Sequence, residues 1–407
     1  MYLYLSVALL LASNGVLAGS ANCNIRNIRD FYKQVKVSGP ILNEAKKKVE
    51  EASSVIDIAE QRPNPELDFE YLKGDEFGLD TNTFALSAKH VVELGSKRGK
   101  RVEKAKSYKR LKEAEIDLAL FNSNLQAVIG YQRVAQLNVT VETVSEAIET
   151  FDKIVRKLSS RKRLNPEETV SLSTLKLASN DYKAQLNDLE NEKTLLLGKL
   201  RFLSSCESIK PTYKYLDYQK IKLTNKSNEQ NGLLKLEDFK VELAESEVEV
   251  QKSLGYSDIS IGPTFEYQGQ GNDEFLSAGI AVSFAIPIFQ TNDGGKVNAI
   301  KSLAAQRSVS VNQKNVLKIK RGNLVSKFNR SLKTLSKMPK LKDLEKKHKR
   351  VDRLFARGVV SIPMTIESHR QQIDFMRSKF ETENDVLSTY GKIILIDGNT
   401  IALEELF

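Results

Sequence analysis

The chain contains no tryptophan and only three histidines, two cysteines and nine prolines among its 407 residues. Because proline is rare and 28% of the residues are charged, the composition favours long helices over several compact cores. The histidines, His90, His348 and His369, are far apart and lack ligand spacing, so we expect no metal site. Neither a catalytic constellation nor a phosphate-cradling loop is present, which predicts a protein that is not an enzyme and needs no cofactor.

Long apolar runs are also scarce. Beyond the N-terminus, no run of about eighteen apolar residues occurs, so no helix is expected to span a bilayer, and only strands could do so. Residues 2–18 are apolar and end in Val16-Leu17-Ala18, which suits cleavage before Gly19 and predicts a signal peptide at 1–18. The stretch lacks a basic n-region, which leaves a misassigned start or a buried N-terminal helix as alternatives.

The chain instead contains an internal repeat. Phe69-Glu70-Tyr71 recurs as Phe265-Glu266-Tyr267, and Lys106-Ser107 recurs as Lys301-Ser302. Each copy has the pattern of an amphipathic helix, two strands, a glycine-containing turn and two long helices. We expect a first repeat at 19–206, a linker at 207–231, a second repeat at 232–396 and a tail at 397–407.

The expected strands alternate apolar and polar residues. They lie at about 65–73, 80–94, 258–268 and 276–289. A single offset between the copies places Phe84 on Ile280 and Leu86 on Val282, which keeps the apolar face in phase. This alternation is typical of barrel strands between lipid and water, although a half-buried soluble sheet alternates in the same way. Four strands cannot close a barrel, so in the membrane interpretation several chains must share one.

Each copy is expected to end in two long helices. They lie at about 101–158 and 167–205, and at about 296–357 and 365–396. Apolar residues from Leu137 to Leu158 alternate in steps of four and three, and Leu175 to Leu203 recur every seven residues. This heptad pattern predicts an antiparallel coiled coil. Pro339 should kink or break the third helix, because it removes a backbone donor.

The net charge is +10 and the pI is about 9.2. Basic residues alternate with Glu and Asp along the helical faces and do not gather in one tract. This pattern favours solvated helices over a nucleic-acid-binding surface.

The order of these elements resembles that of TolC-type outer-membrane efflux proteins over about residues 40–396. Three motifs carry the resemblance: Arg62-Pro63-Asn64-Pro65, Ile286-Pro287-Ile288-Phe289 followed by Gly294-Gly295, and Arg357-Gly358-Val359-Val360-Ser361. The resemblance implies a mainly α fold with a membrane β-barrel contribution. Three copies of the chain would pool their strands into one twelve-stranded barrel, continued by an α-helical tunnel across the periplasm.

The same resemblance implies a passive exit duct of a tripartite efflux or type I secretion system. Its expected partners are two further copies in a homotrimer, outer-membrane lipid, a periplasmic adaptor protein and an inner-membrane pump, with no nucleic acid. The alternative is a soluble basic coiled-coil scaffold or nucleic-acid-binding protein, which would show salt-dependent binding and no membrane fractionation.

Site residues follow from this expectation. The lumen would be lined by Asp68, Glu70, Lys89, Glu93 and Glu266. The residues for gating and adaptor docking would lie at two helical turns, comprising Arg161, Lys162, Arg163 and Leu164, and Arg357, Gly358, Val359, Val360 and Ser361. The basic first turn departs from the small or apolar residues that the family often has there, which suggests an atypical docking partner.

The two cysteines introduce the two repeats. Cys23 lies just past the expected cleavage site and Cys206 ends the first repeat, so the two could lie close together in a pseudo-symmetric fold. A disulfide in an oxidising periplasm and two unpaired thiols both remain open. Lipidation of Cys23 is less expected, because Ser20-Ala21-Asn22 is a poor lipobox.

Overall fold

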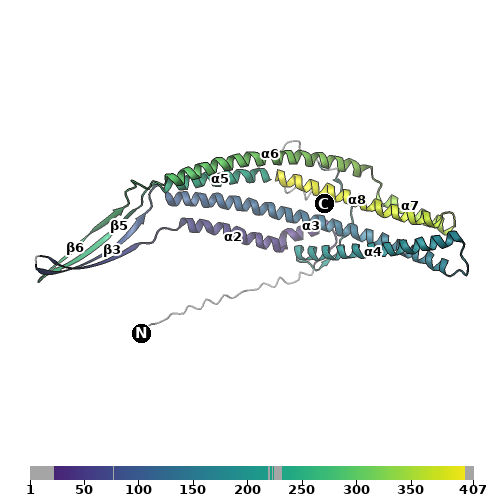
Figure 1. Cartoon of the computed structure of the whole chain (residues 1–407), viewed down its shortest axis with the longest axis horizontal. Helices are drawn as coiled ribbons and strands as arrows, with labels where there is room; N and C mark the ends of the chain where they lie inside the picture. Colours follow the sequence, from purple (N-terminus) through teal and green to yellow (C-terminus); the bar gives the residue numbers. More distant parts are fainter. Residues whose placement is uncertain (1–22, 77, 219–220, 222, 224–231, 399–407) are drawn as a thin grey trace, which may run out of the picture.

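The computed structural model describes residues 23–76, 78–218, 221, 223 and 232–398 (Figure 1). The expected signal peptide at 1–18 lies outside these residues, as does most of the expected tail. The described chain is elongated, with a four-stranded sheet at one end and helices along the rest of its length.

Most of the described residues are helical. The helices are α1 (Ile28–Ser38), α2 (Pro40–Glu60), α3 (Lys97–Ser159), α4 (Pro166–Ser204), α5 (Gly232–Ser253), α6 (Asp293–Lys337), α7 (Leu341–Ala356) and α8 (Ile362–Asp397). The strands are β1 (Asn24–Ile25), β2 (Glu66–Glu76), β3 (Leu79–Val92), β4 (Ser208–Ile209), β5 (Ile259–Gln270) and β6 (Asp273–Phe284). None of the helices in the described part of the chain combines the length and the apolarity needed to cross a membrane.

Helices α3 and α4 form an antiparallel hairpin that uses the heptad residues. Helix α3 has 63 residues and therefore extends for about 95 Å. Its partner α4 begins at a capping box, in which the side chains of Asn165 and Glu168 each bond to the other residue's backbone N–H. Between the two helices, the rings of Phe151 and Tyr182 stack with their centroids 5.5 Å apart, and both residues are buried.

The second long hairpin has a break. The single helix expected at about 296–357 is two helices, because α6 ends at Lys337 and α7 begins at Leu341. Pro339 lies between them, and Met338 before it is extended, as steric clash with a following proline requires.

The sheet has the antiparallel order β2-β3-β5-β6, so its central pair joins the two repeats. Two further short strands pair in parallel: β1 precedes the helices of the first repeat, and β4 precedes those of the second. In the four-stranded sheet, β2 and β6 are edge strands within one chain.

The second hairpin differs from the expectation in register and in extent. Phe69 pairs with Leu86 whereas Phe265 pairs with Ala278, so Leu86 corresponds to Ala278 and not to Val282. The second hairpin is therefore shorter, and the connection from β6 to α6 is longer. The shift is even, so every side chain keeps its face.

The expected strand 276–289 is also too long at its end. Strand β6 stops at Phe284, and Ile286, Ile288 and Phe289 lie exposed beyond it. Pro287 cannot donate to a strand ladder, which explains why pairing does not continue through this motif. The other bounds differ by a few residues, as helix and strand ends commonly do.

Two apolar cores hold the helices together. The central core contains Phe31, Tyr131 and Phe328 and joins α1, α3, α4, α6 and α8. The hairpin core contains Phe151, Tyr182 and Ile373 and joins the α3–α4 hairpin to α8, with Phe355 of α7 packed against it. The hairpin core thus connects the two long hairpins far from the sheet (Figure 1).

Candidate functional site

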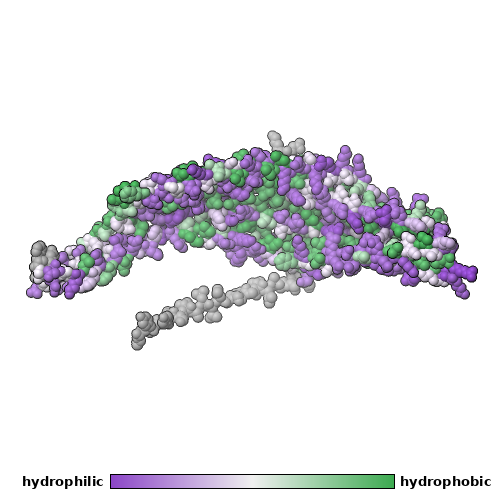
Figure 2. Space-filling view, in the orientation of Figure 1, coloured by the Kyte–Doolittle hydropathy of each residue, from purple (hydrophilic) through white to green (hydrophobic). Residues whose placement is uncertain are grey.

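One face of the sheet is apolar and exposed. Strand pairing aligns Tyr71, Phe84, Tyr267 and Leu276 in one row across all four strands. Leu276 is 80% exposed and Ile280 is 75% exposed. Apolar surface is visible where the sheet meets the helices (Figure 2). Apolar residues gathered in this way indicate a surface that lipid or another protein covers.

The opposite face of the sheet is polar. It carries four of the five residues expected in the lumen: Asp68, Glu70, Lys89 and Glu266. Lys89 Nζ lies 2.7 Å from Asp68 Oδ2, so these two charges are paired. Glu70 and Glu266 occupy one row with Ala85 between them.

Glu93, the fifth expected lumen residue, lies elsewhere. It follows the end of β3, and its carboxylate pairs with Arg101 of α3, whose guanidinium also donates to the backbone oxygen of Gln61 at 3.1 Å. The Glu93 side chain is only 12% exposed. The sequence pattern missed this pairing because the strand was expected to run to residue 94.

A second ion pair fixes the same junction between sheet and helices. Lys97 Nζ lies 2.7 Å from Asp258 Oδ1, which also accepts the backbone N–H of Leu94 at 3.0 Å. Asp258 immediately precedes β5, so the pair ties the start of α3 in the first repeat to the second repeat.

Further along α3, basic side chains pair with acidic side chains of α5. These pairs are Lys100 with Glu249, Lys104 with Glu247, and Arg110 with Glu242. Acidic residues of α5 also pair with α6, as in Arg307 with Glu245 at 2.7 Å. Because these basic groups meet acidic partners between helices, they do not form a one-sign surface of the kind that binds nucleic acid.

The first helical turn projects at the end opposite the sheet (Figure 1). Arg161, Lys162 and Arg163 are exposed, whereas Leu164 is partly buried against the hairpin core. Arg161 pairs with Glu168 of α4. Lys162 and Arg163 therefore carry the charge that this turn presents to solvent.

The second turn lies at the same end, since α7 and α8 pack on the hairpin core. Arg357 and Ser361 flank it. Gly358 has a φ of +75°, a backbone conformation that glycine adopts without strain. Val359 is 70% exposed and Val360 is partly buried. The structure thus brings both sets of expected tip residues to one end of the molecule.

Cys23 and Cys206 are joined by a disulfide with their Cα atoms 5.8 Å apart. Cys206 is buried against the central core, and the bridge lies beside the β1–β4 pair. Of the two alternatives left by the sequence, the structure contains the bridge. A sulfur in a disulfide cannot also carry a thioether-linked lipid.

The expectation that the three histidines lie apart is wrong for two of them. His348 of α7 and His369 of α8 have ring centroids 4.3 Å apart, and Asp352 lies one turn after His348. His90 stays alone on the exposed sheet. The sequence does contain an indication of this contact. The two histidines lie at nearly equal distances from the turn at 357–361, and an antiparallel helical hairpin brings such positions together.

Both of these histidines are buried, His348 with 6% and His369 with 1% of its surface exposed. Burial lowers the pKa of both imidazoles, although Asp352 opposes the effect at His348 and a hydrogen bond to Thr365 opposes it at His369. Both rings are therefore neutral at neutral pH.

A second buried polar group lies near the central core. Glu383 of α8 is fully buried and accepts hydrogen bonds from the Tyr213 hydroxyl at 2.9 Å and from Gln136 Nε2 at 3.1 Å. Lys379 Nζ is 4.0 Å from the same carboxylate. Burial raises the pKa of Glu383. The network ties the segment after β4 to α3 and α8.

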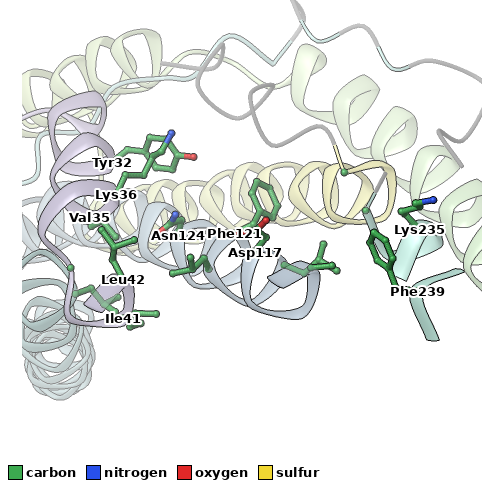
Figure 3. Close-up of a pocket in the computed structure, with 17 residues that line it drawn as sticks. Tyr32, Val35, Lys36, Ile41, Leu42, Asp117, Phe121, Asn124, Lys235 and Phe239 are labelled. Carbon is green, nitrogen blue, oxygen red and sulfur yellow. The ribbon is translucent and has the colours of Figure 1, made fainter. Parts of the chain in front are cut away.

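A groove of about 600 Å³ lies between α1, α2, α3 and α5 (Figure 3). Its lining includes Tyr32, Leu42, Phe121 and Phe239, and Asp117 is the one carboxylate among its described lining residues. Lys36, Lys235 and Asn124 also line the groove, but one carboxylate and two lysines do not make a nucleophile and base pair.

The duplicated helical hairpins and the shared four-stranded sheet give this chain the fold of TolC-type outer-membrane efflux channels. One solved structure with this fold is the outer membrane protein VceC from Vibrio cholerae, with a TM-score of 0.66 and 16% identity over 91% of this chain and 96% of that chain. Another is the open-state outer membrane channel MtrE from Neisseria gonorrhoeae, with a TM-score of 0.68 and 11% identity over 92% of this chain and 89% of that chain. No protein-family model and no curated protein matches the chain.

Proposed function

We propose that this protein is the outer-membrane duct of a tripartite efflux system, a passive conduit for small molecules or ions delivered by an inner-membrane pump and a periplasmic adaptor. The observation that carries the proposal is the sheet, with its exposed apolar face, its polar face and a helical body that extends far beyond it. Strand β5 has 12 residues, close to the 9–11 or so that a tilted membrane strand needs.

The proposed assembly is a homotrimer. Strands β2 and β6 are edges in one chain, and an unpaired edge in hydrocarbon leaves backbone groups unsatisfied at a cost of several kcal/mol each. If β6 of each chain pairs with β2 of the next, three sheets of four strands close a barrel of twelve. This closure removes every edge.

The polar face of the sheet would then line the water-filled lumen. Lys89 and Asp68 neutralise each other, whereas Glu70 and Glu266 add negative charge that is separated by small side chains. Glu66, opposite Lys89, adds a further carboxylate to this face. A lining with charges of both signs suits a wide, weakly selective duct, in which the pump chooses the substrate. The two helical turns at the opposite end would meet the adaptor.

Fractionation of cells tests the proposal. The protein should separate with outer membranes, migrate as a heat-sensitive trimer in mild detergent and conduct ions after reconstitution into planar bilayers. A soluble monomer without conductance would contradict it and favour the alternative, a soluble coiled-coil scaffold. Retention on nucleic acid that weakens steeply with salt would favour the nucleic-acid-binding form of that alternative.

A further inference from the structure

We propose that His348, Asp352 and His369 form a binding site for a divalent transition metal ion such as Zn²⁺, which joins α7 to α8. The site goes beyond the duct function and does not rest on it. One potential ligand atom from each residue lies within 4.8 Å of the other two. Tetrahedral zinc holds its ligand atoms about 3.4 Å apart, so binding requires these atoms to approach one another by up to about 1.4 Å.

The hydrogen bonding at His369 presents a free lone pair. Its Nδ1 lies 2.9 Å from the backbone oxygen of Thr365, and because a carbonyl oxygen only accepts, Nδ1 carries the proton. The other nitrogen, Nε2, is then an unprotonated acceptor, buried with no hydrogen-bond partner in the described structure. A backbone carbonyl that fixes the tautomer of an imidazole is the usual support of a histidine metal ligand.

The other two residues also bury unpaired polar atoms. His348 Nδ1 and Asp352 Oδ1 are inaccessible to solvent and have no hydrogen-bond partner in the described part of the chain. Three such atoms in one small cluster are unusual, because buried polar groups are nearly always bonded. His348 Nε2 also lies 3.4 Å from Asp352 Oδ2, so a cation bound here would take one ligand atom from each of the three residues.

The buried position of helix α7, which in an amphipathic helix is usually aliphatic, is occupied by His348. His348 is the only buried residue of this 16-residue helix. On the other side of the cluster, Phe151 contacts the His369 ring edge-on, with centroids 5.2 Å apart, so the hairpin core closes the site there. Two neutral imidazoles and one carboxylate suit zinc, copper, nickel or iron, whereas calcium and magnesium prefer oxygen ligands alone.

The position of the cluster gives the metal a structural role. Pro339 interrupts the helix between α6 and α7, so no continuous helix from α6 fixes the direction of α7. A metal shared by His348 and His369 would fix α7 against α8 about 15 Å from the Gly358 turn. Metal binding would thereby hold the second tip in one position.

Metal titration of the full chain, purified with a tag that lacks histidine and stripped with a chelator, tests this proposal. Calorimetry with ZnCl₂ should show one tight site per chain. His348→Gln and His369→Gln should each weaken binding by more than about 100-fold, because outer-shell changes alone cost 10–100-fold. His90→Gln, which removes an exposed histidine on the sheet, is the matched control and should bind as the wild type does.

X-ray absorption of the zinc-loaded wild-type chain provides a readout that needs no variant, and it should show two imidazole nitrogens on zinc. Wild-type zinc affinity in the His348→Gln/His369→Gln double variant would overturn the proposal. So would an absorption spectrum without imidazole ligands, or the absence of stoichiometric zinc from the wild-type chain. The cluster would then be two packed histidine rings beside an aspartate only.

Discussion

Glu383 is a carboxylate that folding moves from water into the helical body. Burial raises its pKa above the ordinary value of 4.5, so the folded protein keeps this proton to a higher pH than the unfolded chain does. Between the two pKa values the unfolded state binds fewer protons, and the free energy of unfolding therefore falls as pH rises through that window. Below the unfolded pKa, the contribution of Glu383 is complete.

Glu383→Gln should remove this pH dependence. The amide oxygen still accepts from Tyr213, but residue 383 no longer buries a carboxylate charge, so the variant should exceed the wild type in stability at pH 8 by about 1.4 kcal/mol for each unit of pKa shift removed. Denaturant midpoints at pH 4.5 and pH 8 provide the measurement. Glu381→Gln, at an exposed position on the same helix, should retain the wild-type slope. An unchanged slope in Glu383→Gln would show that the carboxylate titrates normally.

The disulfide closes a sequence separation of 183 residues, a length at which the cross-link restricts the unfolded chain strongly. Cys206→Ser should therefore lower the free energy of unfolding by about 2 to 5 kcal/mol. Mass spectrometry supplies a direct check. The wild-type protein alkylated without reduction should carry no alkyl groups, and it should gain two after reduction. Labelling of both thiols in the unreduced sample would refute the bridge.

At the scale of elements, neighbouring residues of β6 provide a matched pair. Val282 pairs with Ile261 on the apolar face, and Ser283 pairs with Ser260 on the polar face. Val282→Arg should block membrane integration, because a lipid-facing arginine near the midplane costs about 2 to 4 kcal/mol. Ser283→Arg should integrate and alter conductance instead. If membrane fractions contain both variants equally, the apolar face does not contact lipid.

The long helical hairpins and the sheet faces were predictable because they depend on period. A heptad seam ending near Leu158 and resuming at Leu175 specifies two antiparallel helices whatever their exact ends. The hairpin register was not predictable in this way. Whether Leu86 is equivalent to Val282 or to Ala278 in the second repeat, every side chain stays on the same face of the sheet, so the pattern does not distinguish the two registers.

The candidate sites show the same division. The exposed tips and the polar sheet face follow from local sequence pattern. The position of the Glu93 side chain instead depends on where β3 ends and on its ion pair with Arg101. The pairing of His348 with His369 depends on two helices separated by a turn. Spacing along one helix does not reveal such a contact, although distance from the turn does.

At the scale of the whole molecule, the two ends of the proposed duct are separated by the length of α3. The sheet and its ion-paired junction occupy one end, and the hairpin core carries both helical turns at the other (Figure 1). Changes at the tips should therefore leave the sheet intact. This separation makes the proposed adaptor contact testable without loss of trimer or membrane integration.

Val359→Asp tests that contact, because the side chain is 70% exposed in one chain and would be covered on docking. A carboxylate buried there without a partner is costly, so efflux and crosslinking to the adaptor should be lost while trimer remains. Val359→Thr, similar in shape and uncharged, should retain most activity.

At the first turn, the double variant Lys162→Glu/Arg163→Glu should weaken crosslinking to the adaptor only at low salt, because exposed charges are screened over about 10 Å at 0.1 M. Full efflux and crosslinking in both Val359→Asp and the double variant would show that these turns do not dock the adaptor.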